Sequence, residues 1–313
     1  MYNAPVLFII FNRPELTKQS FNAIRNAKPA KLYIAADAPR DTKNENELCK
    51  LARQITETID WPCEVKRNYQ TTNLGCGLGV KSAFDWFFQH EEEGIILEDD
   101  CVAHKDFFHF ATEMLEKYRN NSRILSINGS NLGYYKHERN SQTYVYSRFM
   151  NMWGWATWKS RADLIDYSMA KWKNLNNRNR WLNSRLRQHF FDYDPHWIRL
   201  WENKFNKVAI DNNFTWDWQW IFFQIDKKLI SVVPPVNLVS NIGFGIQATH
   251  TKAEQNPCSN LPVESLDLPL RNPLKLKIDM VFEEQCIKWA WCYHKRMKIP
   301  QLLLLRLKRL LTS

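Results

Sequence analysis

In the segment Ile95-Ile96-Leu97-Glu98-Asp99-Asp100, a short apolar run ends at three consecutive acids. The run begins at Gly94 and has the length of a buried strand, so the acids are expected at a strand end. Neighbouring carboxylates repel one another and are costly to bury without partners. A divalent cation such as Mg²⁺ or Mn²⁺ would relieve this repulsion. A solvated acidic turn before a helix would explain the same pattern, and the spacing alone leaves both interpretations open.

Strands and helices are predicted to alternate on both sides of this segment. The apolar runs predict strands at Val6–Phe11, Leu32–Ala36, Glu64–Arg67, Gly94–Leu97 and Ile124–Ile127. Helical spacing predicts helices at Glu15–Ala27 (after Pro14), Glu45–Ile59, Leu78–Gln89 and Lys105–Arg119. The alternation indicates an α/β fold with a Rossmann-like, mostly parallel sheet flanked by helices. Ligands of such sheets bind beyond the carboxyl ends of the strands.

From about residue 140 the alternation fails, and tryptophan, of which the chain has 14, becomes frequent. We expect residues 141–275 to pack on the sheet as a helical, Trp-rich part of the same domain. Within it, Asn237–Asn272 is expected to be a long loop, and loops of that length are commonly binding segments or lids.

The formal net charge of +10 is concentrated at the C-terminal end. No acid follows Glu284, whereas seven lysines and arginines do, so the main body is only mildly basic. A nucleic-acid groove across the body is therefore not expected. Seven scattered cysteines without a CxxC pair fit reduced thiols, and the apolar run at Val6 lacks the basic leader of a signal peptide. The protein is expected in the cytoplasm.

Residues 276–313 are predicted to form a basic, amphipathic helical tail. The leucine-rich run Gln301–Leu311 is too short to cross a bilayer, which takes about 20 apolar residues. It can lie along the cytoplasmic face of an anionic membrane, with its cations near the headgroups. Docking on the protein core or on a second subunit is the alternative.

Five segments resemble, in the same order along the chain, the N-acetylglucosaminyltransferase I family and its bacterial sugar-transferase relatives. They are Pro5–Arg13, Tyr33–Asp37, Glu98–Phe108, Met152–Trp158 and Thr215–Trp218. Two features depart from the family pattern. Trp218 stands where the family commonly has a second acid, and Asn73-Leu74-Gly75-Cys76-Gly77 is closer to the bacterial relatives. The donor sugar is therefore not inherited from the resemblance.

The resemblance implies a GT-A type fold in which residues 1–140 bind a nucleotide-diphosphate sugar, with a UDP-sugar as the expected donor. Arg13 would contact the diphosphate, and guanidinium geometry suits phosphate. Asp37 would contact the base or ribose. The further nucleotide contacts expected are Asn73, Gly75, Gly77, Lys81 and Asp99. For Arg13 a plain surface arginine, and for Asn73 to Gly77 a plain turn before a helix, are the alternatives.

The resemblance also assigns the metal and the acceptor side. Mn²⁺ or Mg²⁺ would be held by Glu98 and Asp100, with His250 as a further ligand from the long loop unless it is simply solvated. Asp217 would be the general base that deprotonates an acceptor hydroxyl, which predicts single displacement with inversion. The acceptor, a glycan or a lipid-linked sugar, would be held by Trp153, Gly154, Trp155 and Trp216.

Two other classes of protein stay open at this stage. A sugar-phosphate nucleotidyltransferase would share the sheet and the metal, but no glycine-rich basic loop directly follows the first strand. A noncatalytic carbohydrate-binding protein would explain the tryptophans but not the acids at a strand end.

Overall fold

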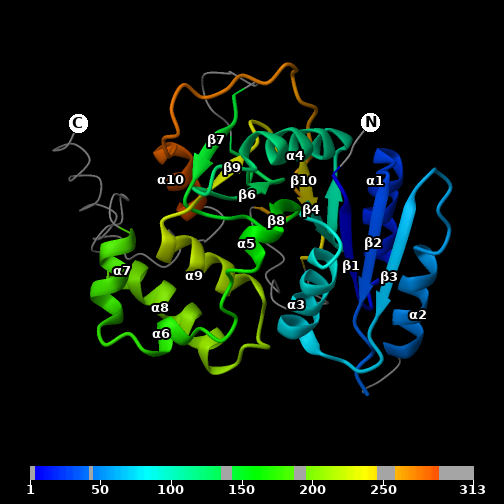
Figure 1. Ribbon diagram of the computed structural model, residues 1–313, viewed down its shortest axis with the longest axis horizontal. Helices are drawn as coiled ribbons and strands as arrows, with labels where there is room; N and C mark the ends of the chain where they lie inside the picture. The colour runs from blue at the N-terminus through cyan, green and yellow to red at the C-terminus, as the bar shows by residue number, and fades with distance from the viewer. Residues whose placement is uncertain (1–3, 42–44, 135–142, 187–194, 245–257, 289–313) are drawn as a thin grey trace.

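The computed structural model describes residues 4–41, 45–134, 143–186, 195–244 and 258–288, with only the backbone at 195–197 and 288 (Figure 1). The first half alternates as expected. Its elements are β1 (Val6–Ile10), α1 (Pro14–Ala27), β2 (Lys31–Ala36), α2 (Glu45–Ile55), β3 (Glu64–Tyr69), α3 (Gly75–Phe88), β4 (Glu93–Glu98), β5 (Cys101–Ala103), α4 (Lys105–Tyr118) and β6 (Ile124–Asn128).

The second half contains strands that the sequence did not predict. Its elements are β7 (Val145–Ser147), β8 (Trp155–Trp158), α5 (Lys159–Ala162), α6 (Ala170–Lys173), α7 (Arg178–Leu186), α8 (Pro195–Ile210), α9 (Asp217–Lys227), β9 (Ile230–Val233), β10 (Val239–Asn241) and α10 (Met280–Lys288). The strands are short and buried throughout, so they show no alternation of apolar and polar residues.

Eight strands form the central sheet in the order β3-β2-β1-β4-β8-β6-β9-β7. The strands from β3 to β4 pair in parallel, as expected, and β6 also pairs in parallel with β9. The strand β8 pairs antiparallel with both β4 and β6, and β7 pairs antiparallel with β9. The second half therefore adds strands to the sheet as well as packing on it, and the sequence did not predict these strands.

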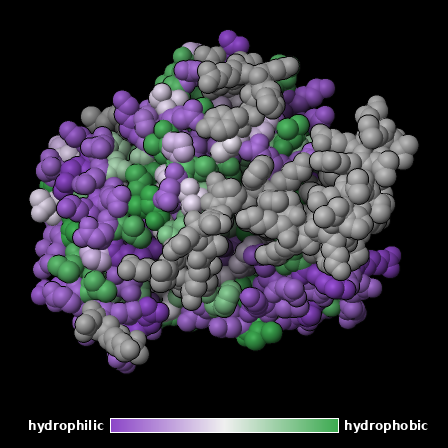
Figure 2. Space-filling view, turned by 180° about the vertical axis from the view of Figure 1, so that it is seen from behind, coloured by the Kyte–Doolittle hydropathy of each residue, from purple (hydrophilic) through white to green (hydrophobic). Residues whose placement is uncertain are grey.

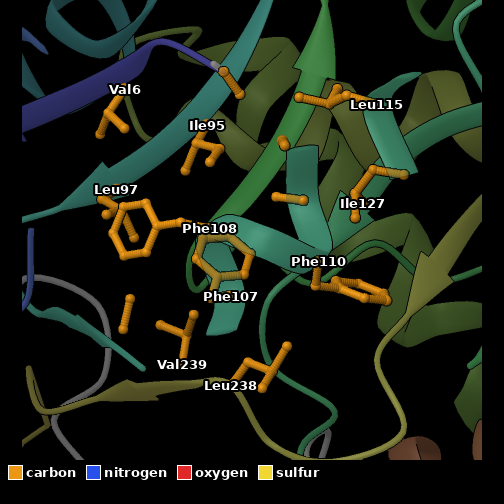
Figure 3. Packing of buried hydrophobic residues seen from close by; sticks show 14 of the residues in the cluster. Val6, Ile95, Leu97, Phe107, Phe108, Phe110, Leu115, Ile127, Leu238 and Val239 are labelled. Atoms are coloured by element: carbon orange, nitrogen blue, oxygen red, sulfur yellow. The ribbon is translucent and has the colours of Figure 1, made fainter. Parts of the chain in front are cut away.

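Each face of the sheet has its own apolar layer. On one face, side chains of β1 and β4 pack against α1 and α4; Figure 3 shows Val6, Ile95 and Leu97 beside Phe107 and Phe108. Alternate residues of the same strands point the other way, toward α3 and the Trp-rich helices α6 to α9. Because these parallel strands are buried on both sides, they read as continuous apolar runs in the sequence.

Two boundaries differ from the sequence prediction for local reasons. The helix α2 ends at Ile55, four residues early, because the N–H groups of Thr56 and Glu57 turn back to carbonyls three residues before them. The helix α3 begins at Gly75, three residues early, because side chains from elsewhere bind the N–H groups of its first turn.

Part of the expected long loop is a strand. Residues Val239–Asn241 form β10, which pairs antiparallel with β5 directly after the acidic segment. The strand β5, which directly follows the acids, is thus held by its pairing with β10 from the later part of the chain.

No helix within the described ranges is both long and apolar enough to cross a membrane. On the described part of the face drawn in Figure 2, hydrophilic side chains interrupt the apolar areas. The basic run from Lys295 onward lies outside the described residues, so its predicted membrane contact stays a prediction.

Candidate functional site

The carboxyl ends of three adjacent parallel strands surround a pocket. The strands β2, β1 and β4 lie side by side, and Asp37, Arg13 and Asp99 follow them. Their side chains line a cavity of about 200 Å³ between the strand ends and α3. Part of its lining, which we call the wall, is apolar and includes Ile9, Ala35, Val80 and Ala83. The polar and charged part, called the rim, consists of Arg13, Asp37, Asn73, Glu98 and Asp99. The pocket therefore offers an apolar surface beside a charged one.

Arg13 is clasped by two carboxylates of the acidic segment. Its Nε donates to Asp99 Oδ2 at 3.2 Å, one terminal nitrogen also binds Asp99, and the other lies 3.0 Å from Asp100 Oδ2. Burial opposes the charged guanidinium, but the charges of Asp99 and Asp100 more than offset this and raise the Arg13 pKa. Arg13 is therefore a fixed cation at the pocket rim, not a mobile surface arginine.

The acidic segment carries more negative charge than Arg13 can neutralise. Burial raises the pKa of Asp99 to about 6, although Arg13 acts to lower it. Burial, followed by the charges of Asp100 and Asp99, raises the pKa of Glu98 well above its usual range. The site therefore disfavours the carboxylate form of Glu98 unless a further cation is present.

Asp217 begins α9 on the side of the pocket where Glu98 lies. Its charge helps to raise the pKa of both Glu98 and the Cys76 thiol, so the three side chains lie within electrostatic reach of one another. Burial is the main cause for Cys76 and raises its pKa to about 12. The Thr215 hydroxyl donates to Asp217 Oδ1 at 2.6 Å. A half-buried carboxylate is thus held beside the pocket by a buried hydroxyl.

The carboxylate of Asp37 binds backbone N–H groups at the start of α3. It accepts hydrogen bonds from the N–H groups of Leu74 and Gly75, at 2.9 Å each, and from Asn73 Nδ2 at 3.2 Å. It still lines the pocket, as do Asn73 and Gly75. The Ala38 N–H also donates to Asp37 Oδ1, at 2.8 Å. Most of the carboxylate's hydrogen bonds are with the start of α3, where a carboxylate suits the helix dipole.

Two expected nucleotide contacts lie elsewhere. Lys81 pairs with Asp85, one helical turn on, and lines a separate pocket with Tyr167. The N–H of Gly77 is hydrogen-bonded to Asn213. Neither residue lines the cavity that Arg13 and Asp37 share, so the structure does not bring them to the proposed donor.

The expected acceptor-side tryptophans divide into buried and half-buried rings. Trp155 is 0% exposed and Trp216 is 4% exposed, and the two rings stack with centroids 5.9 Å apart. They have no face open to a sugar, so in this structure they pack the core, which corrects the expectation for both. Gly154 packs against Val239. Trp153 is half-buried and meets Phe244 edge to face.

The acidic segment also contacts β10. Asn241 Nδ2 lies 3.4 Å from Asp100 Oδ1, and the N–H of Ile242 donates to the Asp100 carbonyl at 2.9 Å. Within the described residues, no three acids, histidines or cysteines converge to enclose a metal ion by themselves. His250, the expected further ligand, lies outside those residues.

Sequence reasoning missed several residues of the pocket and its supports. Arg40, paired with Glu45, and Gln70, which donates to Ser82 Oγ, line the pocket, and Asn213 binds the first turn of α3. Only Asn213 carried a signal, since asparagine is frequent in turns that hold backbone groups. Nothing local in the sequence pointed to its partner.

No protein-family model matches the sequence, and no curated protein matches it. Among solved structures, the chain is similar to a mannosyltransferase from Pyrobaculum calidifontis in complex with GDP-Man and Mn²⁺. The identity is 13% and the TM-score 0.34, over 50% of this chain and 45% of that one. It is also similar to a UDP-glucose pyrophosphorylase complexed with UDP-glucose, at 14% identity and TM-score 0.27, over 46% of this chain and 62% of that one.

A third similar structure is a 4-diphosphocytidyl-2C-methyl-D-erythritol synthase from Anaerococcus prevotii. It shows 11% identity and a TM-score of 0.32, over 56% of this chain and 78% of that one. The chain spans less than two thirds of the first two proteins. At these TM-scores the likenesses are too remote to decide how this chain acts.

Proposed function

We propose that this chain is a glycosyltransferase that moves a sugar from a nucleotide-diphosphate donor to a hydroxyl of a glycan or lipid-linked acceptor. The observation that carries the proposal is the pocket itself. An apolar wall, a fixed arginine and an acidic segment meet there at the carboxyl ends of parallel strands, with Asp217 beside them. Such strand ends are where open α/β sheets bind their ligands.

The two parts of the pocket suit the two parts of a nucleoside diphosphate. The apolar wall formed by Ile9, Ala35 and Val80 fits a flat base, and the rim carries hydrogen-bonding groups for the ribose. Arg13 offers a preorganised fork for phosphate oxygens, because Asp99 and Asp100 hold its guanidinium in place. A UDP-sugar remains the expected donor.

The residues also fit a divalent cation. A diphosphate would be repelled by a rim on which Glu98, Asp99 and Asp100 face one arginine. Mg²⁺ and Mn²⁺ accept one or two carboxylates and complete their shells with phosphate oxygens and water, so no all-protein cage is needed. Glu98 and Asp100 are the residues that would hold the ion. When bound, the ion supplies neutralisation of the charge that develops on the leaving diphosphate.

On the acceptor side, Asp217 would take the proton of the attacking hydroxyl. Its Oδ1 is held by Thr215, which leaves Oδ2 to act as the base. Attack of the deprotonated hydroxyl on the face of the anomeric carbon opposite the leaving diphosphate would invert the anomeric centre. In the segment Met152–Trp158, Trp153 is half-buried and keeps part of its surface exposed for an acceptor.

The link between β1 and α1 disfavours a sugar-phosphate nucleotidyltransferase. Only three residues separate Ile10 from Pro14, and one of them is Arg13. A glycine-rich loop that wraps a triphosphate has no room there.

The proposal is tested by binding and then by transfer. Thermal unfolding is measured with a panel of nucleoside diphosphates and nucleotide sugars, with and without Mn²⁺. A ligand at 100 times its Kd stabilises the fold by about 2.7 kcal/mol, which is about 4 °C for a chain of this length. Arg13→Gln should lose the shift, and Arg25→Gln, in the last turn of α1 and outside the pocket, should keep it.

Turnover then separates the classes of protein. Release of nucleoside diphosphate on adding a glycan acceptor supports the proposal. Formation of a nucleotide sugar from a nucleoside triphosphate and a sugar phosphate would instead identify a nucleotidyltransferase. Glycan binding without any nucleotide binding would identify a noncatalytic protein.

A further inference from the structure

Asn213, in the loop between α8 and α9, attaches this loop to the first turn of α3. Its Oδ1 accepts hydrogen bonds from the N–H groups of Gly77 at 3.0 Å and Leu78 at 2.9 Å. Its Nδ2 donates to the Leu74 carbonyl at 2.8 Å, and its own carbonyl accepts from Gly77 at 3.2 Å. The first N–H groups of a helix have no partner within the helix, so Asn213 supplies what α3 lacks.

The same contact explains why residues 75 and 77 of this turn are glycines. Gly75 has a φ of +82°, and a Cβ there would lie 2.5 Å from Asn213 Nδ2. A Cβ at Gly77 would lie 2.4 Å from the carbonyl oxygen of Asn212 and 2.7 Å from Asn213 Cα. The backbone of the α8–α9 loop thus occupies the space of the missing side chains. Because both glycines lack a side chain, the α8–α9 loop can pack directly against the first turn of α3.

The attached loop leads directly into α9. Asn213 precedes Asp217 by four residues, and between them Thr215 is 5% exposed. The Thr215 hydroxyl donates to Asp217 Oδ1 at 2.6 Å. The attachment at Asn213 is therefore followed, four residues on, by the carboxylate that begins α9.

The opposite side of the same turn is fixed to the pocket. Asp37, at the end of β2, binds the N–H groups of Leu74 and Gly75, while Asn213 binds those of Gly77 and Leu78. The first turn of α3 is held between the strand ends that line the pocket and the loop that carries Asp217. A shift of the loop would change the distance between Asp217 and the pocket.

We propose that Asn213 is a positioning residue, which sets the place of the Asp217 carboxylate relative to the donor pocket by tying the α8–α9 loop to α3. The role of Asp217 rests on the proposed function, whereas the attachment of the two helices does not. Asn213 does not itself line the pocket, and it acts through Asp217.

The attachment is tested first without any substrate, by amide hydrogen exchange on Asn213→Ala. Exchange should become about tenfold faster, or more, in peptides covering residues 75–79 and also in those covering 214–219. Peptides from β1 and α4 should exchange as in the wild type, which shows that the variant folds. Asn212→Ala is the matched control, because the neighbouring asparagine side chain is exposed. Gly77→Ala, which displaces the loop from the other side, should reproduce the effect.

The positioning role is tested by kinetics with the donor found in the binding panel. Asn213→Ala should lower kcat by about 10²-fold, the loss expected from a base misplaced by about 1 Å. The fall in kcat should exceed any rise in the Kd for the nucleoside diphosphate, because Arg13 keeps its contacts with Asp99 and Asp100 in this variant, whereas the loop before Asp217 loses its attachment. Asn212→Ala should change neither quantity.

Each outcome decides something different. Faster exchange near α3 alone, with residues 214–219 unaffected, overturns the inference, as does an unchanged kcat in an active Asn213→Ala enzyme. If the wild type transfers no sugar, the proposed function fails, and exchange at residues 214–219 still decides whether Asn213 orders the start of α9.

Discussion

Replacing Asp217 with asparagine tests the proposed base with little change in shape. The amide oxygen of asparagine can still accept the hydrogen bond that Thr215 donates to Asp217 Oδ1 at 2.6 Å. Loss of the negative charge at the start of α9 costs about 0.3–1 kcal/mol through the helix dipole, which a folded chain tolerates. The variant replaces the other carboxylate oxygen, Oδ2, with an amide nitrogen, which cannot accept the proton of the acceptor hydroxyl.

The expected rate loss follows from that difference. A positioned general base contributes about 10²- to 10⁴-fold, which corresponds to about 3–5 kcal/mol of activation free energy. We expect kcat to fall by about 10²-fold or more, and the affinity for nucleoside diphosphate to stay the same or rise slightly because one negative charge near Glu98 is gone.

The assay is release of nucleoside diphosphate in the presence of acceptor, together with a separate binding measurement. Thr215→Val is the control, since it removes the hydroxyl and keeps the carboxylate; we expect a loss of about tenfold from poorer orientation. Activity of Asp217→Asn within about threefold of the wild type would refute the assignment, because a base contributes far more. Another acid such as Asp211, which is exposed and accepts a hydrogen bond from the Asn213 N–H, would then be the next candidate.

Three further predictions concern the metal, the C-terminal helix and the tail. Asp100→Ala should abolish transfer and remove the Mn²⁺ dependence of nucleotide binding while the fold survives; wild-type affinity that is insensitive to EDTA would exclude a metal from binding. Glu283→Gln removes the buried negative charge that pairs with Arg148, which is 15% exposed, so the free energy of unfolding should fall by about 3 kcal/mol and thermal unfolding should come about 5 °C earlier. An unchanged melting curve would contradict this. The full chain should float with anionic vesicles at low salt, and a chain ending near Lys298 should not; equal flotation would leave the tail as a packing or dimerisation element.

Much of the pocket could be predicted because its signals are local. The apolar runs before Arg13, Asp37 and Glu98 predict buried strands, and parallel strands bring their carboxyl ends to one edge of the sheet. The structure accordingly places these residues around one cavity. Which side chains then pair with Arg13 was not predictable, since Asp99 is 86 positions away.

The tryptophans show where local patterns fail. A tryptophan suits a sugar platform and a core equally well, and the sequence does not distinguish the two uses. Trp155 belongs to β8, which lies in the middle of the sheet between β4 and β6, so its ring is covered by α9 and stacks on Trp216. Burial of both rings follows from the position of an antiparallel strand that the sequence did not reveal.

By itself, the sequence determined the alternation of β1 to α4 and the acids at the end of β4, because periodicity and strand length depend on neighbouring residues. Only the tertiary structure decided what Gly75 and Gly77 accommodate. As a sequence, Asn73 to Gly77 is compatible with a turn that binds phosphate, and a missing side chain does not specify what takes its place. Packing of the α8–α9 loop brought Asn213 to these glycines across 136 positions, and a contact between such distant residues is set by the folded sheet and not by either segment alone.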